Sequence, residues 1–177
     1  MTQLRALIAF FLRHWLATVV VTSAAMLAIA HAFETFGHMA PCTLCLRQRE
    51  IYWEAMAIAA LGGALSLTRL GALAGRATSV VLTCWFLLGA GIAVYHAGAE
   101  WKWWPGPASC SGGAAHVSAA EISALLRGAK MTIPACDKPA WIFLGLSMAG
   151  WNALISLGLA AVSALAALTP ARRGAAA

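Results

Sequence analysis

The sequence contains few charged residues and very few acidic ones. Only 10% of its 177 residues are charged, with 12 lysine and arginine residues and 6 aspartate and glutamate residues, whereas 62% are hydrophobic. A soluble domain of this length could not bury so much apolar surface and still present a polar exterior. The basic residues occur singly between apolar runs, which argues against nucleic-acid binding. The excess apolar surface is therefore expected to face lipid.

Two further absences exclude other architectures. The sequence has no period-2 alternation of apolar and polar residues, so the strands of a membrane β-barrel are not expected. It also has no internal repeat, low-complexity tract or linker, so residues 1–177 are expected to form a single domain. Because a helix satisfies its own backbone in lipid, the sequence predicts an all-α, membrane-embedded four-helix bundle.

Four apolar segments approach or exceed the roughly 20 residues that a helix needs to cross a bilayer. They cover about residues 15–33, 46–67, 78–97 and 141–168. The first segment has an alternative interpretation as a cleaved signal peptide, because arginines precede it and Ala30-His31-Ala32 resembles a small-residue cleavage site. The connections at about 34–41 and 69–77 are short, whereas the loop at about 98–139 is long.

The four spans predict which connections share a side of the membrane. Both termini and the 69–77 connection lie on one side, and the other two connections lie on the opposite side. Each side carries six basic residues, but the first has no acidic residue, which favours the cytoplasm for the termini. Cys42, Cys45, Cys110 and Cys136 all fall on the second side. Because disulfides persist in oxidising compartments, that side is expected to be the periplasm.

The long loop contains a predicted short amphipathic helix over about residues 118–130. Ser118 and Glu121 have the spacing of a capping box, and Ile122, Leu125 and Leu126 form an apolar stripe. Such a helix lies on the bilayer surface or packs on the end of the bundle, and the stripe does not separate the two.

Cys42 and Cys45 form a C-x-x-C motif, which alone indicates either metal binding or redox chemistry. Pro41 precedes the motif and a long helix follows it, so Cys45 is expected near a helix N-terminus. Free N–H groups and the helix dipole favour an anion there. This position favours the thiolate, which is the species that reacts with disulfides.

Two other residues are candidates for holding an electron acceptor. Arg49 lies four residues after Cys45, on the same helical face and about 6 Å deeper. His96 ends the third apolar segment beside Tyr95 and could donate to a quinone carbonyl, although a lone histidine there is more often an ordinary interfacial residue. Arg47 points away from the face of Cys45 and is expected to extend to lipid headgroups.

The remaining cysteines leave alternatives open. Cys110 and Cys136 flank the predicted loop helix, and their spacing fits a structural disulfide and a redox-active pair equally well. A four-cysteine zinc site is disfavoured because there is no second C-x-x-C, and no metal is expected. Cys84 is expected to be a buried, inert packing residue of the third span. Glu54 is costly within the second span unless it is paired.

Taken together, these features resemble the disulfide bond formation protein B family, DsbB. The resemblance rests on the C-x-x-C motif with Arg49, the four spans and the Cys110 and Cys136 pair in a long loop, and it covers about residues 10–168. Further matches are Tyr95-His96, Trp-Pro-Gly-Pro at 104–107, and Phe-Leu-Gly-Leu-Ser-Met at 143–148 leading to Trp151-Asn152.

The resemblance implies a quinone-dependent protein disulfide oxidoreductase of the bacterial inner membrane. Its acceptor would be ubiquinone or menaquinone, and its partner a periplasmic thioredoxin-fold oxidase of the DsbA type. Matching positions imply that the partner attacks Cys110, that the released Cys136 engages Cys42, and that the Cys45 thiolate faces the quinone. Arg49 would lie beside the quinone and His96 near it. Glutamate is common just before the matching arginine, so Gln48 implies different local electrostatics.

Three alternatives to general disulfide formation remain. Some relatives of this family serve a dedicated partner. A non-enzymatic membrane scaffold with two structural disulfides would contain the same cysteines. A protein like vitamin K epoxide reductase would share four helices and a C-x-x-C motif, but its motif belongs near the end of the bundle sequence, whereas here it opens the second span.

Overall fold

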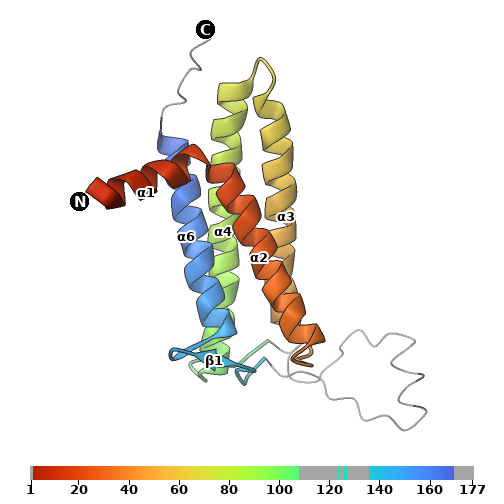
Figure 1. The fold of residues 1–177 in the computed structure, drawn as a ribbon. Helices are drawn as coiled ribbons and strands as arrows, with labels where there is room; N and C mark the ends of the chain where they lie inside the picture. Colours follow the sequence, from red (N-terminus) through yellow and green to blue (C-terminus); the bar gives the residue numbers. More distant parts are fainter. Residues whose placement is uncertain (1, 108–122, 124–125, 127–135, 170–177) are drawn as a thin grey trace.

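The computed structural model describes residues 2–107, 123, 126 and 136–169. Four long helices run side by side as a bundle, and a fifth leaves it at an angle (Figure 1). The helices are α1 (Thr2–Arg13), α2 (Trp15–Thr35), α3 (Thr43–Ser66), α4 (Gly71–Glu100) and α6 (Met148–Leu168). Two short strands, β1 (Ile142–Phe143) and β2 (Leu146–Ser147), precede α6. The predicted all-α membrane bundle is confirmed.

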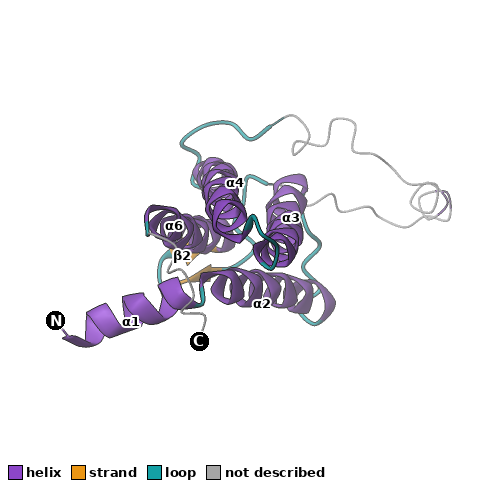
Figure 2. Cartoon of the chain, turned by 90° about the horizontal axis from the view of Figure 1, so that it is seen from above, coloured by secondary structure: helices purple, strands orange, loops and turns teal. Residues whose placement is uncertain are grey.

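The core of the bundle lies where α4 packs against α6 and α3, and α3 against α2 (Figure 2). Small residues allow close approach of α3 and α4, as is usual for membrane helices. A Cβ atom at Gly62 would lie 2.2 Å from the Thr78 hydroxyl oxygen, so only glycine fits there. The buried apolar residues of the core are Val19, Leu27, Ile51, Tyr52, Ala55, Ala59, Leu82, Phe86, Leu159 and Ala160.

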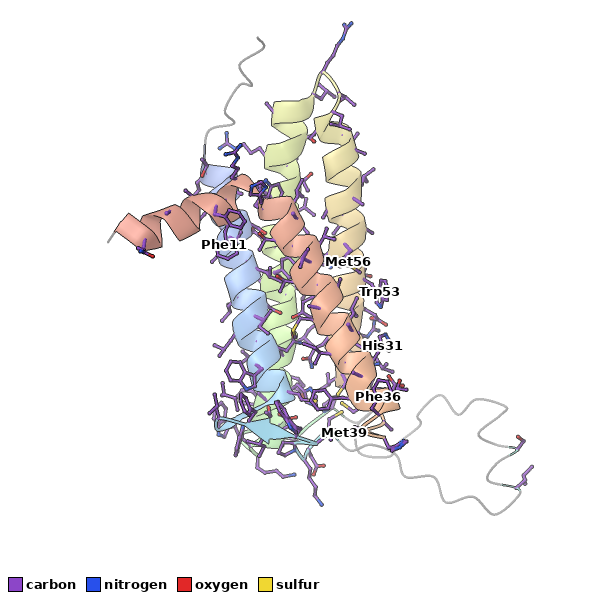
Figure 3. The ribbon with its side chains drawn as sticks, viewed as in Figure 1. Phe11, His31, Phe36, Met39, Trp53 and Met56 are labelled. Atoms are coloured by element: carbon purple, nitrogen blue, oxygen red, sulfur yellow. The ribbon has the colours of Figure 1, made fainter. Side chains whose placement is uncertain are left out.

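Among the described helices, α2, α4 and α6 are long and apolar enough to cross a membrane. Large apolar side chains cover the outside of the bundle, and Phe11, Phe36 and Trp53 point outward (Figure 3). α3 is long enough but carries too many charged residues to count among them, because Arg47, Arg49, Glu50 and Glu54 occupy its first half. Its uninterrupted apolar run begins only at Ala55, after Glu54.

The N-terminal half of the chain differs from the sequence prediction in two places. α1 was not expected as a separate helix, and it lies outside the group of four helices (Figure 2). α4 begins at Gly71, so most of the predicted 69–77 connection is helical. Alanine and leucine are good helix formers, and the glycine falls at the start of α4 where it costs little.

The predicted fourth span begins too early. Residues 142–147 form a β-hairpin in which Ile142 pairs with Ser147 and Phe143 with Leu146. The turn residues Leu144 and Gly145 have φ of 49° and 80°, the left-handed values of a two-residue hairpin turn. α6 begins after Ser147, whose hydroxyl accepts from Gly150 N at 3.2 Å. The predicted helix at about 118–130 lies almost entirely outside the described residues.

The two ends of the bundle carry different features. The start of α2, the α3–α4 turn and the end of α6 lie at one end (Figure 1). The end of α2, the start of α3, the end of α4 and the hairpin lie at the other. The cysteine motif therefore lies at the hairpin end of the bundle.

Candidate functional site

Cys42 and Cys45 occupy the N-terminus of α3. Cys42 is the N-cap residue, with extended backbone, and its sulfur accepts from the Cys45 N–H at 3.3 Å. The two sulfur atoms lie 2.8 Å apart, and both residues are free thiols. Cys42 is buried, whereas Cys45 is half-buried. Sulfur thus replaces the usual oxygen of a helix cap and brings the two thiols together.

The contact between the two sulfurs separates their acidities. The hydrogen bond with Cys45, together with burial, raises the pKa of the Cys42 thiol. The same hydrogen bond lowers the pKa of Cys45 to about 7, against the opposing effect of its own burial. The proton of the pair therefore stays on Cys42, and at neutral pH a large fraction of Cys45 is thiolate.

This separation predicts which thiol reacts first with an alkylating agent. In a Cys84→Ser background, iodoacetamide should label Cys45 with a rate that rises through a midpoint near pH 7, because the thiolate is the reacting species. Cys42 should react more slowly throughout the neutral range. Tandem mass spectrometry that locates the label within the peptide measures both rates, and faster labelling of Cys42 would contradict the assignment.

Cys136 lies beside Cys42 although the two are far apart in the sequence. It is fully buried and disulfide-bonded. The sulfurs of Cys42 and Cys136 and a ring nitrogen of His96 all lie within 4.8 Å of one another. Cys110 lies outside the described residues. These three residues could hold a metal ion in principle, but a disulfide sulfur offers no thiolate to coordinate one.

An ion pair fixes the segment that follows Cys136. The Lys102 ammonium lies 2.5 Å from a carboxylate oxygen of Asp137. The hydrogen bond from Lys102 holds the pKa of Asp137 below its usual value. Lys102 is the second residue after the end of α4. The ion pair therefore joins the segment that follows Cys136 to the end of that helix.

His96 belongs to a buried row of polar side chains between α3, α4 and α6. Its Nε2 atom lies 3.6 Å from Cys42 Sγ and 3.7 Å from Glu100, and its Nδ1 lies 2.8 Å from Gln48 Nε2. Gln48 Oε1 accepts from Asn152 Nδ2, and Asn152 Oδ1 accepts from the Tyr52 hydroxyl. The row ends at Ser156, 3.2 Å from that hydroxyl. His96 thus faces the thiols, and both its ring nitrogens have protein neighbours.

Arg49 faces α2. Its guanidinium donates to Glu34 Oε2 at 2.5 Å and to the Ala30 carbonyl at 3.2 Å, and its side chain is 15% exposed. Arg47 is 67% exposed and pairs with Glu50 on its own helix, which agrees with its expected surface position. Arg49 is therefore the arginine that is held in place one turn below Cys45.

Several residues of the site were not predicted from the sequence. Glu34, Gln48, Glu100 and Asn152 were assigned no contact, and only their neighbours across helices reveal one. Asn152, a polar residue inside the apolar run of the fourth predicted span, was the available signal, whereas Gln48 lies among charged residues. Cys84 was predicted to be buried, but it is exposed on the outer face of α4. Glu54, expected to be costly within the second span unless paired, is exposed on the surface of α3.

Comparisons with known proteins agree with this geometry. A family model described as "Disulfide bond formation protein DsbB" matches residues 12–166. The chain is 29% identical over 160 residues to "Disulfide bond formation protein B" of Dechloromonas aromatica (strain RCB), which covers 86% of this chain and 90% of that protein. No solved structure matches. The match spans the cysteine motif, the four bundle helices and the loop between α4 and α6, and the chain belongs to the DsbB family.

Proposed function

We propose that the protein is a membrane thiol oxidase that reoxidises a periplasmic thioredoxin-fold protein of the DsbA type and delivers the electrons to membrane quinone. Membership of the DsbB family supports a role in disulfide bond formation. One observation carries the finer proposal. The Cys42 sulfur lies 2.8 Å from Cys45 and within 4.8 Å of the disulfide-bonded Cys136.

The proposal assigns each cysteine a step in thiol–disulfide exchange, starting from Cys42–Cys45 and Cys110–Cys136 disulfides. A thiolate of the partner attacks Cys110, forms a mixed disulfide and releases Cys136 as a thiolate. Cys136 attacks Cys42, which forms a Cys42–Cys136 disulfide and releases Cys45 as a thiolate. The second thiol of the partner then attacks the mixed disulfide at the partner's own sulfur and leaves the partner oxidised and Cys110 as a thiolate.

The last exchange restores the loop disulfide. Cys110 attacks Cys136 of the Cys42–Cys136 disulfide and releases Cys42, which leaves Cys42 and Cys45 as the reduced pair. The described state, with two free thiols beside a disulfide-bonded Cys136, matches this point in the sequence of steps. The lowered pKa of Cys45 supports it as the sulfur that next gives up electrons.

The residues around Cys45 fit a quinone as electron acceptor. A bound quinone would accept the two electrons of the Cys42–Cys45 pair with two protons and leave as quinol. Arg49 is a fixed cation whose N–H groups already bind two oxygen atoms, Glu34 Oε2 and the Ala30 carbonyl, so its donors suit a quinone oxygen. Cys45 is only half-buried, so its sulfur is approachable.

The energetics explain why an acceptor other than an ordinary disulfide is needed. A partner as oxidising as about −120 mV can hardly be reoxidised by such a disulfide, because 30 mV corresponds to about 1.4 kcal/mol for two electrons. A membrane quinone is a stronger oxidant than such a disulfide and makes reoxidation of the partner favourable. In this proposal the hairpin end of the bundle faces the periplasm of the inner membrane and both termini face the cytoplasm.

The proposed function is tested by turnover with purified components. The full-length protein in detergent should reduce a soluble ubiquinone analogue when a reduced DsbA-type partner is added, and the loss of quinone absorbance measures the rate. A scaffold with structural disulfides would show no dependence on either component. Quinone reduction that is independent of the reduced partner would contradict the proposal.

A further inference from the structure

We infer that the Gln48 side-chain amide holds His96 in one tautomer, with the ring proton on Nε2 directed at Cys42. Gln48 is then a positioning residue for the thiol pair. Its own orientation is settled by a backbone group. One atom of the amide lies 3.1 Å from the Leu44 carbonyl oxygen, which can only accept a hydrogen bond. That atom is therefore the nitrogen, Nε2.

A second contact supports the same orientation from the other side of the amide. The remaining Gln48 atom, Oε1, accepts from Asn152 Nδ2. Because Gln48 Oε1 accepts, Asn152 faces it with Nδ2, and its Oδ1 then accepts from the Tyr52 hydroxyl. Reversing Gln48 would place two oxygens together at Leu44 and two N–H groups together at Asn152. The row of polar groups is consistent in one direction only.

The orientation of Gln48 determines the state of the imidazole. Gln48 Nε2 also lies 2.8 Å from His96 Nδ1, and because an amide nitrogen donates, Nδ1 must accept with a lone pair. A neutral imidazole with an accepting Nδ1 carries its proton on Nε2. An imidazolium would set an N–H of its ring against the N–H of Gln48, so the geometry favours the neutral ring.

The Nε2–H group then acts on the thiol pair. It lies 3.6 Å from Cys42 Sγ, and the neighbouring Glu100 carboxylate oxygen lies 3.7 Å from the same nitrogen. Cys42 Sγ thus accepts from His96 and from the Cys45 backbone N–H, and both donors stabilise negative charge on this sulfur. Gln48 thereby favours the thiolate of Cys42, the sulfur that the proposed relay releases when the Cys110–Cys136 disulfide forms again. This role at the thiols rests on the proposed function, whereas the tautomer does not.

The tautomer can be read directly from the imidazole ¹⁵N signals of the full-length protein in nanodiscs, with His96 assigned by the signals lost in His96→Asn. The wild type should show a protonated Nε2 and an unprotonated Nδ1. Gln48→Glu has the same shape but cannot donate, so Nδ1 should become protonated. Ser156→Ala, at the far end of the row, should leave the His96 signals unchanged.

The same variants connect the tautomer to the chemistry. Gln48→Glu should slow alkylation of Cys42 at neutral pH about tenfold, the size of effect expected when a hydrogen bond to a charged sulfur is lost. A wild-type spectrum with a protonated Nδ1 would overturn the inference without any variant. Because the spectrum needs no turnover, this outcome is distinct from a failure of quinone reduction, which bears on the proposed function alone.

Discussion

Replacing Cys45 by alanine should lower the rate of quinone reduction by more than about a thousandfold, the scale seen when a nucleophile is removed from an active site. Cys45 carries the negative charge of the pair, because its pKa is lowered to about 7 while that of Cys42 is raised. Without it, the Cys42–Cys45 disulfide cannot form, so the pair cannot pass two electrons to the quinone. The measurement is quinone absorbance with a reduced DsbA-type partner.

Cys84→Ala is the matched control for this substitution. Cys84 is exposed on the outer face of α4 and is a free thiol, so its loss should change turnover by less than about twofold. If turnover survives Cys45→Ala in protein with an unchanged thermal unfolding midpoint, Cys45 does not pass electrons to the quinone. That result would contradict the proposed relay.

Replacing Arg49 by leucine should raise the KM for a soluble quinone analogue by about ten- to a hundredfold, since a charged hydrogen bond contributes about 1.5–3 kcal/mol. The guanidinium is 15% exposed and held by Glu34 and the Ala30 carbonyl, so its position is fixed before an acceptor arrives. Arg49→Lys should recover part of the affinity, because a lysine keeps the charge but loses the planar fork. Steady-state kinetics with varied quinone measure these values.

Two controls separate acceptor binding from structural support. Arg47→Leu removes an exposed arginine two residues away, and the KM for quinone should stay near the wild-type value. Glu34→Gln removes the ion pair but leaves the Arg49 cation. If Arg49 acts only through that ion pair, Glu34→Gln will raise the KM as much as Arg49→Leu does, and the assignment to quinone binding would be wrong.

The sequence predicted those features that depend on local pattern. The helix after Pro41 follows from an apolar run, and the positions of Cys45 and Arg49 on it follow from helical spacing alone. The start of α6 was missed because residues 142–147 are as apolar as a span, and only the left-handed pair Leu144 and Gly145 reveals a hairpin.

The contacts that complete the site could not be predicted, because they join residues on different helices. Gln48 meets His96 and Asn152 across sequence separations of 48 and 104 residues. No spacing rule links such positions in one sequence. Glu34 was treated as a loop residue, but α2 continues to Thr35 and brings its carboxylate to Arg49. Packing of the bundle, rather than helical periodicity, places these groups.

The central claim is that Cys42 passes electrons from Cys136 to Cys45, and a stalled exchange tests it most directly. Oxidised full-length protein is mixed with a DsbA-type partner that retains only its nucleophilic cysteine, free thiols are alkylated, and disulfide-linked peptides are mapped without reduction. The account predicts a Cys42–Cys136 disulfide, a partner–Cys110 disulfide and an alkylated Cys45. An alkylated Cys136 beside an intact Cys42–Cys45 disulfide would contradict it.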